Sequence, residues 1–189
     1  RESWKADIGR AFGPDDSPRD VLSTLVNAHT RSLEETASVM DLALMNKIAR
    51  RIALCAHVDI YGIGGSAVMA KELQSRLYRI GVNSHYWSEV HAGLTSAAIQ
   101  DGNCVAIGIS NTGRTEETIQ MLRQAGASGA PTVALSHHPG SPLAEASHLP
   151  IIPSVHEQFL HQAQLSPPHV QLLALATPSP RVPPVTFAP

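Results

Sequence analysis

Residues 57–67 decide the fold: they read HVDIYGIGGSA, and residues 105–117 repeat the same plan as VAIGISNTGRTEE. Each stretch starts with an apolar run typical of a buried strand, turns through glycine and hydroxyl residues, and ends where a helix is expected. In an open parallel sheet such turns gather at the carboxyl ends of the strands, where ligands bind. Their hydroxyls and backbone N–H groups suit a small phosphorylated ligand.

Further strand and helix patterns alternate on both sides of these two stretches. Helices are expected over residues 67–80, 90–99 and 115–125, with a short helical turn at 142–146. The strands that they connect are expected over residues 58–62, 84–87, 104–109, 132–135 and 149–152. Alternation at this spacing predicts right-handed crossovers and an α/β fold. The expected architecture is a three-layer α-β-α sandwich around a five-stranded parallel sheet, doubly wound as in flavodoxin.

The two ends of the chain differ from this alternating centre. Residues 2–12 are compatible with a short helix, and a longer amphipathic helix is expected from Asp20, with Ser17 as its N-cap and Pro18 in its first turn. Another helix is expected over residues 42–54. Residues 158–189 contain seven prolines and one formally charged residue, Arg181, so this tail is expected to be mostly irregular.

Charge and apolar content limit the classes of protein to which this chain can belong. The 189 residues are 43% hydrophobic and carry a formal net charge of -2, so charge alone does not indicate nucleic-acid binding. No apolar run reaches about 18 residues and no secretory segment opens the chain, which predicts a cytoplasmic protein without a membrane partner. Cys55 and Cys104 are expected to be buried free thiols, with a disulfide or metal site as the alternative. Because the first residue is Arg1 rather than an initiator methionine, we expect that this chain is part of a longer protein.

The first loop, Gly62-Ile63-Gly64-Gly65-Ser66, resembles a dinucleotide fingerprint only loosely, because Ala67 stands where the third glycine belongs. Glu89 follows at roughly the distance, about 20 residues, at which such a site places its ribose-binding acid. An NAD site therefore stays open as an alternative. The lysine of a P-loop is absent from the loop, which argues against nucleoside triphosphate hydrolysis.

The second loop is more specific, since Ser110, Thr112 and Thr115 follow the spacing S-x-[ST]-G-x-T. A turn at Gly113 would bring the three hydroxyls together beside the N–H groups of the next helix, whose dipole favours an anion. In the alternative interpretation, Ser110 and Thr112 only cap the helix and Thr115 faces solvent.

Together, the two loops resemble the SIS (sugar isomerase) domain, and within it the RpiR-type transcription regulators. Residues 139–144, PGSPLA, also fit that family, and the resemblance covers about residues 20–153. It implies that Ser66, Ser110, Thr112 and Thr115 contact a ligand phosphate, and that Gly64 and Gly65 let the backbone approach it. It also implies that Gly113 holds the turn. Asn111, which shapes the loop, is expected among the ligand-binding residues as well.

The resemblance also implies a domain plan. Residues 1–14 would be the remnant of an N-terminal helix-turn-helix domain, residues 15–40 a linker helix and residues 41–157 the SIS domain, which binds a phosphosugar, a carbohydrate derivative. Residues 158–189 would be an atypical Pro-rich tail in place of the family's long helix. The implied protein is a sensor whose sugar phosphate ligand modulates DNA binding. It would form a homodimer or tetramer, touch DNA only through a domain upstream of this chain, and need no cofactor or metal.

An aldose–ketose isomerase is the main alternative to a sensor. Proton transfer between neighbouring carbons needs a base, for which Glu117 is the best candidate and His91 the second. In the simpler interpretation, Glu117 stabilises a helix dipole and His91 is solvated. The adjacent His137 and His138 lack an acid or cysteine that would complete a metal site. An interaction module without any ligand would leave the hydroxyl pattern unexplained.

Overall fold

The computed structural model describes residues 17–152 of the 189-residue chain. The helix expected over residues 2–12 and the irregular tail expected over residues 158–189 lie outside the described residues. Within them, the chain divides after Met40 into helix α2 and a compact unit that begins at Asp41.

Helix α2 (Pro18–Val39) begins as its sequence predicts. The Ser17 side chain accepts a hydrogen bond of 3.2 Å from the backbone N–H of Asp20, and Pro18 occupies the first turn, where its missing N–H costs nothing. The long amphipathic helix is therefore confirmed, with Ser17 as its N-cap and Pro18 in its first turn.

The compact unit is built on five parallel strands, in the order β2-β1-β3-β4-β5. The strands are β1 (His57–Tyr61), β2 (Ser84–Trp87), β3 (Cys104–Ile109), β4 (Thr132–Leu135) and β5 (Leu149–Ile151). This confirms the parallel doubly wound sheet. The chain leaves β1 toward β2 on one side and resumes with β3 on its other side. The order therefore reverses between β1 and β3, the position at which open α/β sheets bind ligands.

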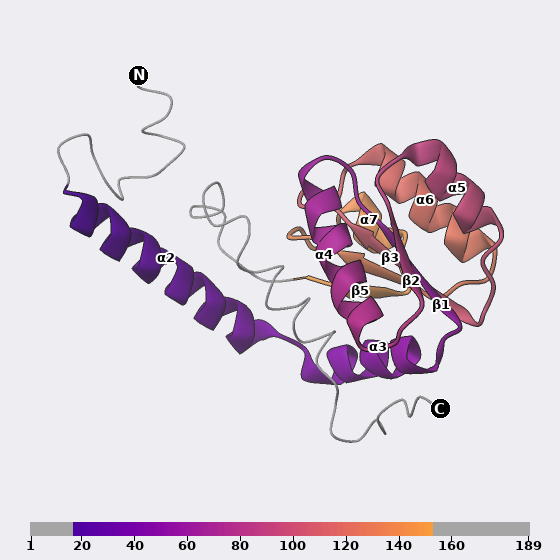
Figure 1. The fold of residues 1–189 in the computed structure, drawn as a ribbon, viewed down its shortest axis with the longest axis horizontal. Helices are drawn as coiled ribbons and strands as arrows, with labels where there is room; N and C mark the ends of the chain where they lie inside the picture. Colours follow the sequence, from indigo (N-terminus) through magenta and orange to yellow (C-terminus); the bar gives the residue numbers. More distant parts are fainter. Residues whose placement is uncertain (1–16, 153–189) are drawn as a thin grey trace. The chain divides into compact units, whose positions relative to one another are not determined.

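Helices cover both faces of the sheet, which confirms the three-layer sandwich (Figure 1). Helix α4 (Gly65–Arg79) packs on one face of β1 and β2, whereas α5 (Val90–Ala98), α6 (Glu116–Ala127) and the short α7 (Pro142–Glu145) lie on the opposite face. Helix α3 (Leu42–Leu54) contacts β5. No helix among the described residues is long and apolar enough to span a membrane.

A continuous apolar core joins the sheet to α5, α6 and α7. Its strand members include the fully buried Tyr61 and Ala106, and its helix members include Leu122 and Leu143. At the helix contact, Gly93 of α5 leaves room for Met121 of α6. This packing fixes the starts of the helices relative to the strands that precede them.

Candidate functional site

Two loops lie side by side at the carboxyl edge of the sheet because β1 and β3 are neighbours. Tyr61, the last residue of β1, pairs with Gly108 near the end of β3. The loop at residues 62–64 and the loop at residues 110–115 therefore leave the sheet together, as the sequence predicts.

The first loop leaves its backbone open. Gly64 has φ +60°, a conformation that side chains rarely adopt, and it ends the loop at the N-terminus of α4. This explains why α4 begins at Gly65 rather than at the expected Ala67. A Cβ at Gly64 or Gly65 would meet no atom within 4 Å. Packing therefore does not demand a glycine at Gly65, and space remains for a group that approaches its backbone.

Ser66 lies half-buried in the first turn of α4. Its backbone N–H donates to the carbonyl of Ile63 at 3.2 Å. Within residues 17–152 no hydrogen bond engages the Ser66 hydroxyl, so that group stays available at the start of the helix.

The second loop brings two of its three hydroxyls together. Ser110 is 1% exposed, and its Oγ lies 2.9 Å from Oγ1 of the half-buried Thr115. Ser110 Oγ also accepts a hydrogen bond of 3.1 Å from the backbone N–H of Gly113. Ser110 thus closes the turn before α6 rather than capping the helix, and Thr115 is not a solvent-facing side chain.

The other two polar residues of the loop are exposed. Thr112 Oγ1 accepts a hydrogen bond of 3.2 Å from the backbone N–H of Arg114, which ties it to its own turn. The Asn111 side chain is exposed as well. Thr112 therefore does not join the Ser110–Thr115 pair in this structure.

The N-termini of α4 and α6 differ from those of the other described helices. In α2, α3, α5 and α7, a side chain at the N-cap accepts a hydrogen bond from a first-turn N–H group. Neither Gly64 of α4 nor Thr115 of α6 provides such a bond. First-turn N–H groups carry the positive end of the helix dipole and attract anions. In α4, two of them already donate to backbone carbonyls: Ser66 N–H to Ile63 at 3.2 Å and Ala67 N–H to Gly64 at 3.1 Å. The two loops therefore open onto two helix ends that can receive a negative group.

Glu89 occupies the equivalent position at α5. Its two carboxylate oxygens accept hydrogen bonds of 2.9 and 2.8 Å from the backbone N–H groups of His91 and Ala92. These two bonds, that of Ala92 first, lower the pKa of Glu89 below its ordinary value. The acid that a dinucleotide site would require is thus engaged with its own helix.

The two candidate isomerase residues are both exposed. Glu117 lies in the first turn of α6, and His91 lies in the first turn of α5. Among residues 17–152, no hydrogen bond or ion pair joins them. Their geometry does not form an acid–base pair in this structure.

Sequence reasoning placed His137 and His138 at this edge, in the loop after β4, but missed the buried serines of that loop. Ser136, His137 and Ser141 are all buried there. Burial, and secondarily the neighbouring His138, lowers the pKa of His137 to about 4, so its imidazole is neutral near pH 7. The motif PGSPLA at residues 139–144 was the available signal.

Sequence reasoning also missed a buried carboxylate in β1. Asp59 is fully buried and accepts hydrogen bonds from three other side chains: Tyr61 at 3.2 Å, Ser96 at 2.5 Å and Gln100 at 2.5 Å. His57 Nε2 lies 2.8 Å from its other oxygen. Because Ser96 lies in α5 and Gln100 just after it, this network ties β1 to α5 beneath the site.

Other polar features do not form a second site. Among the residues that the structure describes, no group of three or more histidine, cysteine or acidic side chains could hold a metal ion. Cys55 and Cys104 are free thiols, as expected, but both are half-buried rather than buried. Desolvation raises the pKa of Cys55 to about 11.

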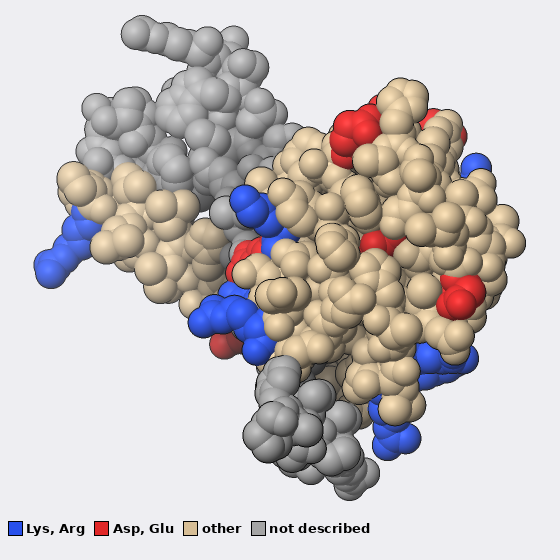
Figure 2. All heavy atoms as spheres, turned by 45° about the vertical axis from the view of Figure 1, so that its right-hand side comes forward, with Lys and Arg blue, Asp and Glu red and all other residues tan. Residues whose placement is uncertain are grey.

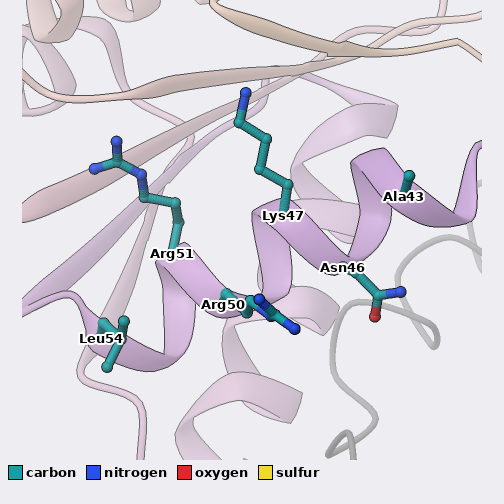
Figure 3. Close-up of a pocket in the computed structure, with 6 residues that line it drawn as sticks. All are labelled: Ala43, Asn46, Lys47, Arg50, Arg51 and Leu54. Atoms are coloured by element: carbon teal, nitrogen blue, oxygen red, sulfur yellow. The ribbon is translucent and has the colours of Figure 1, made fainter.

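A hollow of about 460 Å³ lies against α3 and is lined by six residues: Ala43, Asn46, Lys47, Arg50, Arg51 and Leu54. Figure 3 shows Lys47 and Arg51 extending to one side of the helix and Arg50 to another. The three cations therefore do not converge on one anion. Leu54 precedes the amino end of β1, so this hollow is not part of the loop edge.

Comparison with known proteins assigns the chain to a family. The sequence model of the SIS domain family matches residues 51–177. An uncharacterized HTH-type transcriptional regulator of Caldanaerobacter subterraneus is 27% identical over 161 residues, 85% of this chain and 57% of that protein. The HTH-type transcriptional regulator RpiR of Escherichia coli is 28% identical over 132 residues, 69% of this chain and 44% of that protein. The chain thus spans about half the length of the curated relatives it matches.

A solved structure shares the fold. Vibrio vulnificus NanR, complexed with ManNAc-6P, aligns with a TM-score of 0.74 at 23% identity. The alignment covers 86% of this chain and 60% of the NanR chain.

Proposed function

The chain belongs to the SIS domain family, and from this premise we propose that it is the phosphosugar-binding sensor domain of a bacterial transcriptional regulator. Its sequence relatives are HTH-type regulators, and NanR, which shares its fold, was solved with a sugar phosphate. In the proposed protein, ligand binding modulates DNA binding by a helix-turn-helix domain upstream of this chain.

One observation carries the proposal: the two helix N-termini at the reversal point of the sheet, α4 and α6, lack the side-chain caps that the other described helices have. A phosphate group supplies an acceptor at helix starts that no side chain caps. The hydroxyls of Ser66, Ser110 and Thr115 stand beside the same two ends. A phosphate bound there would complete both helix starts at once.

The proposed contacts follow from this geometry. Ser66, Ser110 and Thr115 donate to phosphate oxygens, and the backbone at Gly64 and Gly65 approaches the phosphate through open space. Gly113 holds the turn by donating its N–H to Ser110. The exposed Asn111 and Thr112 would have to reorient to reach the ligand.

A sensor is favoured over an isomerase by the exposure of Glu117 and His91. A catalytic base works within hydrogen-bond reach of its proton, in a site that excludes water. Among the described residues, neither side chain is held in such a position. Glu117 lies in the first turn of α6, where its negative charge interacts favourably with the positive end of the helix dipole.

DNA contact is proposed to come from outside the described residues. On the face shown in Figure 2, lysine and arginine side chains lie in separate small groups rather than in one basic stripe, whereas a nucleic-acid surface gathers them. The proposal places the protein in the cytoplasm as a homodimer or tetramer, with α2 as the linker helix. A ligand that prefers one arrangement of the assembly would shift its population and so alter DNA binding.

The test is thermal-shift titration of this chain with ManNAc-6P, other sugar phosphates and inorganic phosphate. We expect stabilisation by at least one sugar phosphate that exceeds the effect of inorganic phosphate, and its loss in the double variant Ser110→Ala/Thr115→Ala. Ser75→Ala, on an exposed position of α4, is the matched control. A folded wild-type chain that no sugar phosphate stabilises would contradict the proposal.

Turnover of the stabilising ligand separates the two functions. The sensor binds it without converting it, so an assay for the isomeric sugar phosphate should stay at background. Turnover that disappears in Glu117→Gln would establish the isomerase instead.

A further inference from the structure

We propose that Ser141, in the loop after β4, is a positioning residue for the phosphate-binding loop after β3. This inference rests on the proposed function, because it assigns the element that holds the Ser110–Thr115 pair in place. Ser141 contacts the loop at Gly113, and the hydrogen bonds of its hydroxyl go to Ser136 and Ala144 rather than to Ser110 or Thr115.

The two loops are first joined through their backbones. The N–H of His137 donates to the carbonyl of Asn111 at 3.1 Å, and the N–H of Leu143 donates to the carbonyl of Gly113 at 3.0 Å. One bond thus lies on each side of Thr112. The phosphate-binding loop is therefore fastened to the neighbouring loop at two points.

The side chains of Ser136 and Ser141 then close around Gly113. A Cβ at Gly113 would overlap the Ser141 side chain and would lie 2.5 Å from Ser136 Oγ. Gly113 also has φ +65°, so both its conformation and its contacts exclude a larger residue. The turn is held by direct contact with these two serines, which are both 4% exposed.

Ser141 is fixed in turn by its own hydrogen bonds. Its hydroxyl donates to Ser136 Oγ at 3.1 Å and accepts from the backbone N–H of Ala144 at 3.4 Å at the start of α7. Ser136 Oγ also accepts from the N–H of His138 at 3.2 Å. Because buried hydroxyls with satisfied partners have few alternative positions, this pair forms a rigid wall behind Gly113.

A change at Ser141 would affect the proposed phosphate contacts through a series of neighbouring residues. Ser141 contacts Gly113, the N–H of Gly113 donates to Ser110 Oγ, and Ser110 Oγ lies against Thr115 Oγ1. If the Ser141 hydroxyl is removed, the turn gains room and the two hydroxyls lose their fixed separation. We expect about a tenfold loss of affinity for a sugar phosphate, the size of one hydrogen bond.

The experiment compares Ser141→Ala, Ser141→Thr and Ser147→Ala with wild type. Ser147 is the matched control, since its hydroxyl donates to the carbonyl of Ala144 at 2.8 Å at the far end of α7 and not toward Gly113. Calorimetric titration with ManNAc-6P and with inorganic phosphate gives the affinity. The backbone amide resonance of Gly113 reports the position of the turn, which a loss of stability alone does not move.

We expect Ser141→Ala to weaken binding of the probe and to shift the Gly113 amide, Ser141→Thr to restore both, and Ser147→Ala to change neither. Wild-type affinity in folded Ser141→Ala would overturn the inference. If Ser141→Ala does not fold, Ser136→Ala tests the same wall from its other side.

Failure of the proposed function gives a different result. If wild type binds none of the probes, the sensor assignment fails, while the Gly113 amide still decides whether Ser141 positions the turn. An unchanged Gly113 amide in Ser141→Ala would then overturn the positioning role on its own.

Discussion

Ser110 and Thr115 meet side chain to side chain at 2.9 Å across the loop at residues 110–115, whose glycine donates its N–H to the same Ser110 oxygen. The bond forms because Gly113 turns the chain back before α6 begins. It places two hydroxyls at a helix N-terminus that has no side-chain cap. The contact between Ser110 and Thr115 is the most specific geometric feature of the candidate site.

Replacing Thr115 by valine removes this hydroxyl and keeps the shape of the side chain. We expect the affinity for a sugar phosphate to fall at least tenfold, because a hydrogen bond to a charged group contributes about 1.5–3 kcal/mol. The melting temperature should also fall, because valine leaves the buried Ser110 hydroxyl without its partner at 2.9 Å, so the affinity is compared under conditions in which the variant is folded. Titration calorimetry measures the affinity, and Thr95→Val, on an exposed position of α5, is the control. Equal affinities in wild type and Thr115→Val would remove Thr115 from the site.

Gly64 and Gly65 should respond differently to alanine. Gly64→Ala forces a side chain into φ +60° and should destabilise the fold by about 1–2 kcal/mol. Gly65 has open space around it and lies in α4, so alanine there should leave stability equal or slightly higher. Its methyl group should nevertheless weaken ligand binding, since it fills the space through which the phosphate approaches. Chemical denaturation and calorimetry together test the pair, and unchanged binding in Gly65→Ala would exclude that approach.

The sequence predicts the sheet well because each strand is a short apolar run bounded by turn residues. The spans of β2, β3 and β4 are as expected, whereas α4 and α6 differ at their ends by one or two residues. Those ends depend on backbone conformation at Gly64 and Thr115 rather than on periodicity. The closeness of the two loops was predictable for a related reason, since a parallel sheet brings successive strand ends to one edge.

The missed features all depend on contacts between distant segments. Asp59 stands as a single acid in an apolar run, and its partners Ser96 and Gln100 lie 37 and 41 residues away. The contact of Ser141 with Gly113 likewise joins two different loops. Local patterns carry no information on such pairs, which the tertiary fold alone creates.

Removing the carboxylate of Asp59 should strongly destabilise the fold. Asp59→Ala leaves the donors of Tyr61, Ser96 and Gln100 buried without an acceptor, which we expect to cost about 3–5 kcal/mol. Urea denaturation followed by circular dichroism measures the loss. The control is Glu145→Ala, because Glu145 is an exposed acid in α7. If both variants lose the same small amount, the buried network does not hold β1 to α5.

The pH dependence of stability should carry a contribution from His137. Its pKa in the folded protein is about 4, below the ordinary value of 6.5, because burial disfavours the imidazolium. Between these two pH values the unfolded chain binds a proton that the folded chain does not. The contribution of His137 is therefore complete above pH 6.5 and is lost as the pH falls toward 4, by about 3 kcal/mol at most. Its Nδ1 has no hydrogen-bond partner among the described residues that would offset this loss.

Urea denaturation of wild type and His137→Gln from pH 7.5 to pH 4.5 tests this contribution. The variant should lose less stability than wild type over that interval, because glutamine does not titrate. His91→Gln serves as the control for the same substitution at an exposed histidine. Parallel curves for wild type and His137→Gln would show that His137 does not make folding pH-dependent. A smaller slope in the variant would instead place a neutral, buried imidazole beside the proposed phosphate loop.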